Sequence, residues 1–326
     1  MALDIAPTLQ SSITSFPNGI ASFGIPVIGS GAGIPVTTGS YFFVDSSLGL
    51  SGNSGTSPST ALATVDQAIN KCTADKGDVI ICMPGHAEAV TATSITLDVA
   101  GVRAVGLGHG RLRPAFTYGA AAATITVSAD DCGWSNCVFV ANFDNVAAAF
   151  TVGAGKDFQL VGDNEFVDKS SALHFLSIVT TGATANAADG LTVMGNRYVG
   201  GLALAPAAFL SVLGTLDRLR LGLNYAKMAS TDDEGSFITL ADKNITNAEI
   251  WGNRHIVVGS TGATVGIFLT GSGTACTGMV HNNYVSSLDT TAELIATAGT
   301  GLKFFENYYT GTADASGKLW PVVDAA

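Results

Sequence analysis

The sequence has few charged residues and lacks any long hydrophobic run. Only 13% of its 326 residues are charged, whereas 47% are apolar. No stretch of 18 consecutive apolar residues occurs, so this apolar content does not come from a membrane-spanning helix. The formal net charge of −11 disfavours nucleic acid as a partner, because phosphates are bound by basic surfaces. We therefore expect contact with neither membrane nor nucleic acid, and an oligomer that covers exposed apolar faces.

Cysteine is scarce and is not arranged for metal binding. The five Cys residues have no zinc-type spacing, since Cys132 and Cys137 lack a second pair. We expect them to be small buried thiols. The first residues, Met1 to Asp4, contain neither the basic region nor the apolar segment of a secretory signal. We predict no cofactor and no metal, and synthesis and assembly in the cytoplasm.

Lys and Arg are absent from residues 1–40, which contain four of the nine prolines. Proline removes backbone donors and favours extended chain before it, so no helix is expected here. The segment is also too apolar for a typical disordered tail. We predict an extended arm that becomes ordered on the surface of another protein. Its contact residues are Phe16, Phe23, Ile25, Pro26, Val27, Ile34, Pro35 and Val36. An arm that folds back over the end of its own chain is the alternative.

Asparagine recurs through the rest of the chain at intervals of 25 to 32 residues. A fixed period in this range indicates a solenoid or array. In all but the first repeat, an apolar residue stands three positions before the Asn, as Val193 does before Asn196. We predict that these side chains stack at one corner and exchange amide hydrogen bonds. The predicted structural ladder consists of Asn136, Asn164, Asn196, Asn224, Asn253, Asn282 and Asn307.

The local pattern within each repeat indicates strands. The segments 191–193 and 219–221 alternate apolar and polar residues, and Gly or Asn interrupts each one. No sustained apolar stripe at helical spacing follows Cys72. We therefore predict an all-β fold, a parallel β-helix of about three short strands per coil.

The start of this β-helix is expected to carry one helix. Residues 64–72 place apolar side chains on one face, and Thr64 is a suitable N-cap. Strands are expected at 41–45 and 79–82. An open β-helix exposes unpaired strand edges at its end, so a helix that caps this end is expected.

The same region carries a resemblance to a known family. The run Phe43-Val44-Asp45, then Gly52-Asn53-Ser54-Gly55, then Pro58 to Ala68 and Gly77 to Gly85, resembles the N-terminal cap of pectin-lyase-like β-helix proteins. The variant with this Gly-Asn-Ser-Gly loop is similar to those of tailed-bacteriophage particles. The resemblance implies a single-stranded right-handed parallel β-helix. It does not imply one activity, because members include polysaccharide lyases, hydrolases, tailspikes and non-enzymatic virion proteins.

Candidate catalytic groups are few. Sugar hydrolases need two carboxylates, one that donates a proton and one that activates water or attacks. Asp130-Asp131 and His109 occur in an order unlike that of the hydrolases with this fold, and adjacent strand residues point to opposite faces. Asp232-Asp233-Glu234 is either a solvated loop or a calcium site, and His255 falls in a position that other repeats fill with tyrosine. We predict no catalytic residue.

These expectations favour a non-enzymatic structural protein of a bacteriophage virion, assembled in the host cytoplasm. The preferred form is a capsid decoration or cement protein, a homotrimer whose arms bind the major capsid protein. The alternative is a tailspike or fibre that binds host surface polysaccharide, with or without cleavage. A secreted polysaccharide lyase is disfavoured, because the leader and the acid–base constellation are missing.

The expected organisation has four parts. Residues 1–40 form the Pro/Gly-punctuated arm, and 41–85 the N-terminal cap and first coil. Residues 86–310 form the parallel β-helix, and 311–326 a C-terminal tail or cap.

Overall fold

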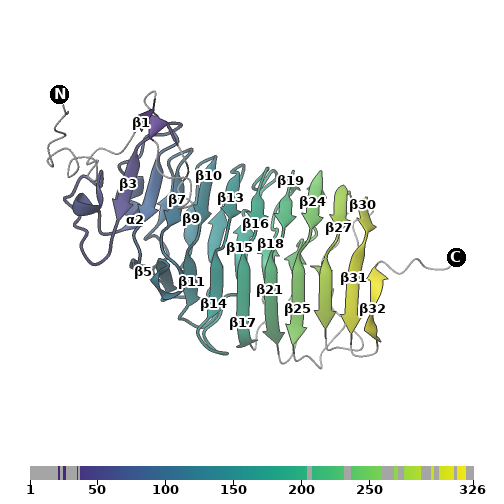
Figure 1. Ribbon diagram of the computed structural model, residues 1–326. Helices are drawn as coiled ribbons and strands as arrows, with labels where there is room; N and C mark the ends of the chain where they lie inside the picture. The colour runs from purple at the N-terminus through teal and green to yellow at the C-terminus, as the bar shows by residue number, and fades with distance from the viewer. Residues whose placement is uncertain are drawn as a thin grey trace, which may run out of the picture.

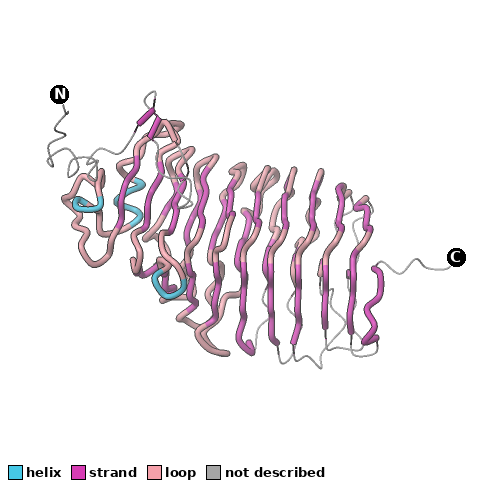
Figure 2. Tube along the Cα trace, in the orientation of Figure 1, coloured by secondary structure: helices cyan, strands magenta, loops and turns pink. Residues whose placement is uncertain are grey.

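The chain forms an all-β solenoid, seen in the computed structural model as a row of strands stacked side by side (Figure 1). The structure describes residues 21–22, 25–26, 35, 37–203, 208–230, 236–258, 268–270, 275–287, 295–296, 301–311 and 314–320. Nearly all strand pairs between neighbouring turns of the chain are parallel. Loops join the strands along both edges of the row (Figure 2).

Within the described residues, the strands form three large sheets. Sheet 1 contains, in order, β3 Tyr41–Val44, β4 Val79–Cys82, β7 Arg103–Gly106, β10 Cys132–Ser135, β13 Phe158–Val161, β16 Thr192–Met194, β20 Arg220–Gly222, β24 Ala248–Trp251, β27 Gly278–His281 and β30 Leu302–Phe305. Sheet 2 contains β5 Ala87–Val90, β8 Ala115–Tyr118, β11 Val138–Ala141, β14 Glu165–Asp168, β17 Arg197–Ala203, β21 Tyr225–Ser230, β25 Arg254–Val258, β28 Tyr284–Ser287, β31 Asn307–Gly311 and β32 Asp314–Trp320. Sheet 3 contains β6 Thr96–Leu97, β9 Ile125–Val127, β12 Phe150–Val152, β15 Ser177–Thr181, β18 Ala208–Ser211, β22 Ile238–Thr239, β26 Leu269–Thr270 and β29 Ile295–Ala296.

The chain visits these sheets in rotation, and one such round is called a coil here. After β4 in sheet 1 it enters β5 in sheet 2 and β6 in sheet 3, then returns to sheet 1 as β7. A small sheet of β19 Leu216–Asp217 and β23 Ile245–Thr246 adds to the turn that leads back into sheet 1. At the last described coil β32 pairs antiparallel with β31.

Strand alternation places one large apolar cluster between the three sheets. In β11 the burial alternates, with Phe139 and Ala141 facing the core. Aromatic rings stack from coil to coil inside this core. The rings of Phe139 and Phe166 are 4.8 Å apart, and Phe237 lies 5.0 Å from Phe209 and 5.3 Å from Phe268. Each coil therefore buries its side chains against equivalent residues of its neighbours, as expected for a repeat protein.

The corner from sheet 1 into sheet 2 has the same backbone conformation in successive coils. A residue with positive φ ends each turn, including Asp163 at 55°, Leu223 at 57° and Glu306 at 54°. This left-handed conformation favours Gly, Asn and Asp over other residues. The next residue in each case points inward and begins the return into sheet 2, so the corner repeats with the coil.

Near the start of the solenoid the one described α-helix packs on the core. Helix α2, Val65–Ile69, buries Val65, Ala68 and Ile69, and the Thr64 side chain accepts a hydrogen bond from Gln67 N at 3.3 Å. The expected Thr64 N-cap is thus confirmed. Two short 3₁₀ helices, Pro58–Thr60 and Gly110–Leu112, complete the helical content of the described residues.

Candidate functional site

A column of buried asparagines runs along the corner between sheets 1 and 2. The side-chain oxygen of Asn224 accepts from Asn196 N at 3.0 Å and from Asn196 Nδ2 at 3.1 Å. Asn224 Nδ2 in turn donates to Asn253 Oδ1 at 3.0 Å and to Val193 O, one coil earlier, at 2.9 Å. The full column is Asn164, Asn196, Asn224, Asn253, Asn283 and Asn307. It supplies partners for polar groups that would otherwise be buried unsatisfied at each corner.

Two of the seven predicted ladder residues lie outside this column. Asn136 and Asn282 occupy the preceding left-handed position, with φ values of 55° and 54°. The buried positions that follow are Cys137 and Asn283, and Cys137 N donates to Asn164 Oδ1 at 3.2 Å. The predicted register is therefore wrong by one residue at these two corners. The reason is that Asn suits both the left-handed turn position and the amide column.

The predicted arm residues lie only partly within the described part of the chain. Ile25 and Pro26 form β2, Ile25–Pro26, which pairs antiparallel with β1, Ala21–Ser22. Pro35 is also described, and its carbonyl oxygen accepts a hydrogen bond from Tyr41 Oη at 2.9 Å. Phe16, Phe23, Val27, Ile34 and Val36 lie outside the described residues.

The root of the arm, Pro35 and residues 37–41, is pinned to the first strands of sheet 1. Thr37 Oγ1 donates to Gly77 O at 2.5 Å, and Ser40 N donates to Asp78 Oδ1 at 2.6 Å. Asp78 is 3% exposed, and its second oxygen accepts from Thr73 N at 2.7 Å. A hydrogen-bonded, buried carboxylate with two backbone donors thus fixes where the arm leaves the solenoid.

Next to the arm root, a second apolar cluster lies on the outer side of sheet 1. Val79, Ile81 and Val105 are 1%, 0% and 3% exposed although they point away from the main core. Tyr41 and Phe43, with Met83 and Leu107, pack against them. The first coils therefore bury apolar side chains on both faces of the sheet, at the place where the arm emerges.

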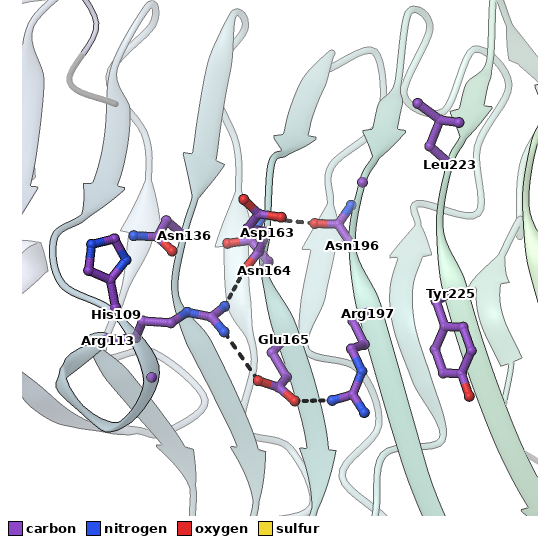
Figure 3. A pocket seen from close by; sticks show the side chains of 12 residues that line it. His109, Arg113, Asn136, Asp163, Asn164, Glu165, Asn196, Arg197, Leu223 and Tyr225 are labelled. Carbon is purple, nitrogen blue, oxygen red and sulfur yellow. Dashed lines mark hydrogen bonds and ion pairs between the residues drawn. The ribbon is translucent and has the colours of Figure 1, made fainter. Parts of the chain in front are cut away.

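Two adjoining hollows mark the outside of the corner between sheets 1 and 2, and Figure 3 shows the residues that line the smaller one. Their volumes are about 410 and 640 Å³, and His109, Asn136 and Asp163 line both. His109 precedes the 3₁₀ helix 110–112 and Arg113 follows it, and both residues line the smaller hollow. The hollow is thus formed where successive corners leave room beside short turns.

A charged triplet lies in the smaller hollow. Arg113 donates to Glu165 Oε2 at 3.1 Å and to Cys137 O at 3.0 Å, and it also bonds the Asp163 carbonyl. Arg197 bonds the other oxygen of Glu165. Because both Glu165 oxygens accept from guanidinium groups, this carboxylate serves as an electrostatic bridge between two arginines. The Arg113 side chain is 14% exposed and that of Arg197 is 55% exposed.

From Glu165 a row of charged and aromatic side chains continues along the outer face of sheet 2. Its members, here called the Arg–Tyr row, are in register on neighbouring strands: Glu165, Arg197, Tyr225, Arg254, Tyr284 and Tyr308. The Arg254 guanidinium lies over the rings of Tyr284 and Tyr225, at 5.3 and 6.0 Å, and Arg197 lies over Tyr225 at 5.8 Å. Such stacking fixes the cations in place while their outer edges stay exposed. The Arg–Tyr row can therefore bind carboxylate or phosphate groups along the solenoid.

The sequence contains a signal for this row that the repeat analysis did not use. Each member is the residue directly after a column asparagine, as Arg197 follows Asn196 and Tyr284 follows Asn283. Because the column residue points inward, the next residue on the strand must point outward. Reading the residue after each buried asparagine would have found the row.

The structure does not bring together the acids and the histidine considered as catalytic candidates. His109 lies at the corner between sheets 1 and 2, whereas Asp130 and Asp131 lie in the turn from β9 to β10, at the opposite edge of sheet 1. Asp130 is bonded by Lys156 at 3.1 Å. Asp157 is the main cause that raises the pKa of the Asp131 carboxyl, with partial burial and Asp130 adding to it.

The remaining candidates are placed as follows. His255 is fully buried in the core, 5.5 Å from the Phe237 ring, and it pairs in register with Ala226 and Val285. Asp232-Asp233-Glu234 lies outside the described residues. All five cysteines are free thiols, and burial is the main cause that raises the pKa of Cys72 to about 12 and that of Cys132 to about 11.

The described part of the chain contains no group of three or more His, Cys, Asp or Glu side chains arranged to hold a metal ion. Nor does any helix in these residues have the length and apolar character needed to cross a membrane. Comparison of the chain with protein-family models, curated proteins and solved structures finds no match.

Proposed function

We propose that this chain is a non-enzymatic structural protein of a bacteriophage particle, a decoration or cement protein of the capsid. In this proposal its arm binds the major capsid protein and its β-solenoid projects as a rigid knob. Three copies form the functional unit, which is assembled in the host cytoplasm and resides on the virion. The origin in a phage rests on the resemblance of residues 43–85 to the caps of such proteins.

The observation that carries the proposal is the pinned root of the arm. Thr37, Ser40 and Tyr41 hold the root of the arm against the first strands, beside the apolar cluster around Ile81. An arm whose root is fixed loses less conformational entropy when it binds than a freely swinging one. Three arms on one trimer would bind the coat lattice at the same time, and the affinity would rise because each bound arm holds the other two at a high effective concentration.

The proposal includes the finer geometry of the fold. The solenoid would be a right-handed β-helix with one strand per sheet in each coil, and α2 would close its N-terminal end. The rotation of the chain through sheets 1, 2 and 3 supports one strand per sheet in each coil, whereas the right-handedness rests on the resemblance of residues 43–85. The burial of Val65, Ala68 and Ile69 beside the first strands supports the closure by α2. An open end would otherwise expose strand edges.

The test is deletion of residues 1–34, which leaves the root of the arm intact. Capsids of the encoding phage that lack this protein are mixed with the full chain or with the deletion variant and then sedimented. The full chain should sediment with the capsids, whereas the deletion variant should remain in the supernatant with an unchanged far-UV circular dichroism spectrum.

The matched control is Tyr41→Phe, which removes the hydroxyl bonded to Pro35 O but keeps the arm residues. It should bind capsids with at most a few-fold loss, because one hydrogen bond contributes about 1 kcal/mol. Binding of the deletion variant at the level of the full chain would refute the arm assignment.

A tailspike or fibre that binds host polysaccharide remains the second candidate, and the Arg–Tyr row favours it. Arg197 and Arg254 present guanidinium edges at intervals along the solenoid, which suits an acidic polymer. Incubating the protein with purified host polysaccharide and measuring binding and chain length would test this. Binding that Arg254→Gln abolishes would favour the tailspike function over the capsid function.

A further inference from the structure

At the start of the solenoid, an irregular loop covers the open edge of sheet 1. β3 is the first strand of this sheet, and no further strand of the sheet lies beyond it in the described residues (Figure 1). Phe43 N donates to Gly55 O at 2.7 Å, and Phe43 O accepts from Leu62 N at 2.8 Å. Residues 45–62, here called the end loop, therefore take the place of a neighbouring strand beside β3.

The end loop exposes two large apolar side chains. Leu48 is 75% exposed and Leu50 is 65% exposed, the two highest values among the large apolar side chains of the described residues. The loop also packs on the core, but Ala61 and Leu62 make that contact and are buried. Leu48 and Leu50 therefore add little to the packing of the solenoid.

Hydrogen bonds fix the backbone that carries these two leucines. Leu48 N donates to Asp45 Oδ1 at 3.2 Å, and Gly49 N donates to Asp45 O at 2.8 Å. Leu50 N donates to Ala61 O at 3.1 Å. The turn from Asp45 to Leu50 is thus held at both ends by partners within the end loop.

Close contacts hold the same turn against the rest of the protein. Gly49 lies so near Leu62 that a Cβ atom would collide with the Leu62 carbonyl oxygen. Ser46 Oγ accepts from Ala87 N at 2.8 Å, which ties the end loop to the first strand of sheet 2. The leucines cannot turn toward the core without breaking these contacts. A rigid pair of this kind loses little conformational entropy on binding.

The chemistry around the pair selects the class of partner. Residues 46–62 contain no charged and no aromatic side chain. A nucleic acid or an acidic glycan is bound through basic side chains, which are missing from the end loop. A rigid, apolar and uncharged projection fits instead an apolar depression on the surface of another protein.

The position of the end loop identifies which protein this is. Ser40, bonded to Asp78 in the root of the arm, stands directly before β3, and the end loop follows directly after that strand. Four residues of strand span about 13 Å. A protein that binds the arm near its root therefore also lies within reach of Leu48 and Leu50.

We propose that the end loop is a second contact with the major capsid protein, in which Leu48 and Leu50 enter an apolar surface of the coat beside the site of the arm. The inference rests on the proposed function and adds the orientation of the solenoid to it. The end that carries β3 faces the capsid, and the end that carries β30 and β31 points away from it.

A second copy of this chain fits the end loop less well than the coat does. Copies that meet end to end would place two arm roots in the same junction, where the arms could not both reach a common lattice. Copies that lie side by side bring the flanks of their solenoids together and leave the ends free. In either case a trimer that binds a capsid through its arms needs the end loops turned toward the coat.

The contact does not have to be strong by itself. Once the arm is bound, the end loop is held beside the coat at a high effective concentration, so a small apolar contact adds to the affinity. The deletion variant that lacks residues 1–34 has no such advantage. It should stay in the supernatant although its end loop is intact.

The first experiment removes the apolar side chains from the full-length chain. Leu48→Ser with Leu50→Ser keeps the arm and the backbone of the loop, and sedimentation with capsids that lack the protein measures the apparent Kd. Binding should weaken at least tenfold, because the apolar area of both side chains is no longer buried. The urea midpoint of the isolated variant should be unchanged, since both positions are exposed.

The matched control removes similar side chains from the flank of the solenoid. Leu223 is 59% exposed and Met279 is 47% exposed, and both lie many coils away from β3. Leu223→Ser with Met279→Ser should change the apparent Kd by less than twofold. A loss of binding equal to that of the end-loop variant would show a general effect of surface polarity and would overturn the proposal.

The second experiment tests the orientation directly. A benzophenone attached to the thiol of Leu50→Cys should cross-link to the major capsid protein on irradiation, as identified by mass spectrometry. The same probe on Lys303→Cys, in β30 at the far end, should not reach the coat. The chain without either substitution gives the background, since four of its five cysteines are buried. Equal cross-linking from Leu50→Cys and Lys303→Cys would refute the orientation.

The outcomes separate this inference from the proposed function. If deletion of residues 1–34 abolishes binding and the end-loop variant binds like the full chain, the end contact is wrong and the arm assignment stands. If the deletion variant binds like the full chain and the end-loop variant does not bind, the arm assignment is wrong and the end contact stands. A full chain that does not sediment with capsids overturns both.

Discussion

Removing one amide from the middle of the asparagine column should destabilise the solenoid far more than a single side chain usually does. In Asn224→Ala, the N–H of Asn196 loses its acceptor, and Val193 O and Asn253 Oδ1 each lose a donor. All three asparagines are at most 2% exposed, so water cannot replace these bonds without opening the corner.

The expected cost follows from these contacts. An orphaned buried donor costs about 1–3 kcal/mol, and each further lost bond costs about 0.5–1.5 kcal/mol. Asn253 Oδ1 keeps the N–H of residue 224, which reduces the loss. The sum is about 2–4 kcal/mol, a large share of the stability of an ordinary domain.

Urea unfolding followed by far-UV circular dichroism measures this cost, provided that the m-value is unchanged. The matched control is Asn282→Gly, at an exposed corner position whose φ of 54° glycine adopts without strain. It should change the free energy of unfolding by at most about 0.5 kcal/mol. Equal effects of Asn224→Ala and Asn282→Gly would show that the column does not stabilise the fold, and would refute the reasoning.

Three further predictions follow from the outer contacts and the thiols. Arg113→Met should lower the free energy of unfolding by about 2–3 kcal/mol, because the mostly buried guanidinium of Arg113 bonds Glu165 and Cys137 O. Arg197→Met should lower it by less than about 1 kcal/mol, because Arg197 is more exposed. Similar urea midpoints for the two variants would contradict this. Gly222→Ala should displace the Trp251 ring and cost about 1–3 kcal/mol, with a shift of the tryptophan emission maximum, and an unchanged spectrum would count against the packing. Because burial raises the pKa of Cys72 to about 12 and that of Cys132 to about 11, their thiolate fractions at pH 8 are about 10⁻⁴ and 10⁻³. Iodoacetamide should therefore leave these two thiols unmodified in the folded protein but alkylate them in urea, as measured by mass spectrometry of tryptic peptides.

The solenoid architecture could be predicted because it repeats. The interval between asparagines is long enough to average over local exceptions, and the alternation in segments such as 191–193 excludes helix. The Thr64 cap and the strand at 79–82 could be predicted from local rules, since each depends on neighbours within a few residues. These features need no knowledge of how coils face one another.

The register at two corners could not be predicted by the same means. Asn282 and Asn283 are adjacent, and only the contact with the next coil decides which one points inward. Cys137 holds a column position without an amide, because it contributes only its backbone N–H to Asn164. The sequence pattern records only side-chain types, so it does not reveal a column position that is filled through a backbone N–H.

The charged features of the surface could be recognised only once the register of the strands in three dimensions was known. Glu165 is 52 residues from Arg113 and 32 from Arg197, so no local motif joins them. Asp130 and Asp131 are close in sequence to His109, yet the solenoid places the two acids at one edge of sheet 1 and His109 at the other. Sequence proximity is a poor guide to neighbours in a fold where each contact spans one whole coil.

The asparagine column has a consequence for how the length of this protein can change. Adjoining members are separated by 28, 29 and 30 residues between Asn196 and Asn283, yet they make the same bonds. Variation in loop length is thus absorbed away from the corner, which offers the same donors and acceptor at every level. Coils can therefore be duplicated or removed as whole units. The length of such a solenoid can evolve in steps of one coil, without any change to the corners that remain.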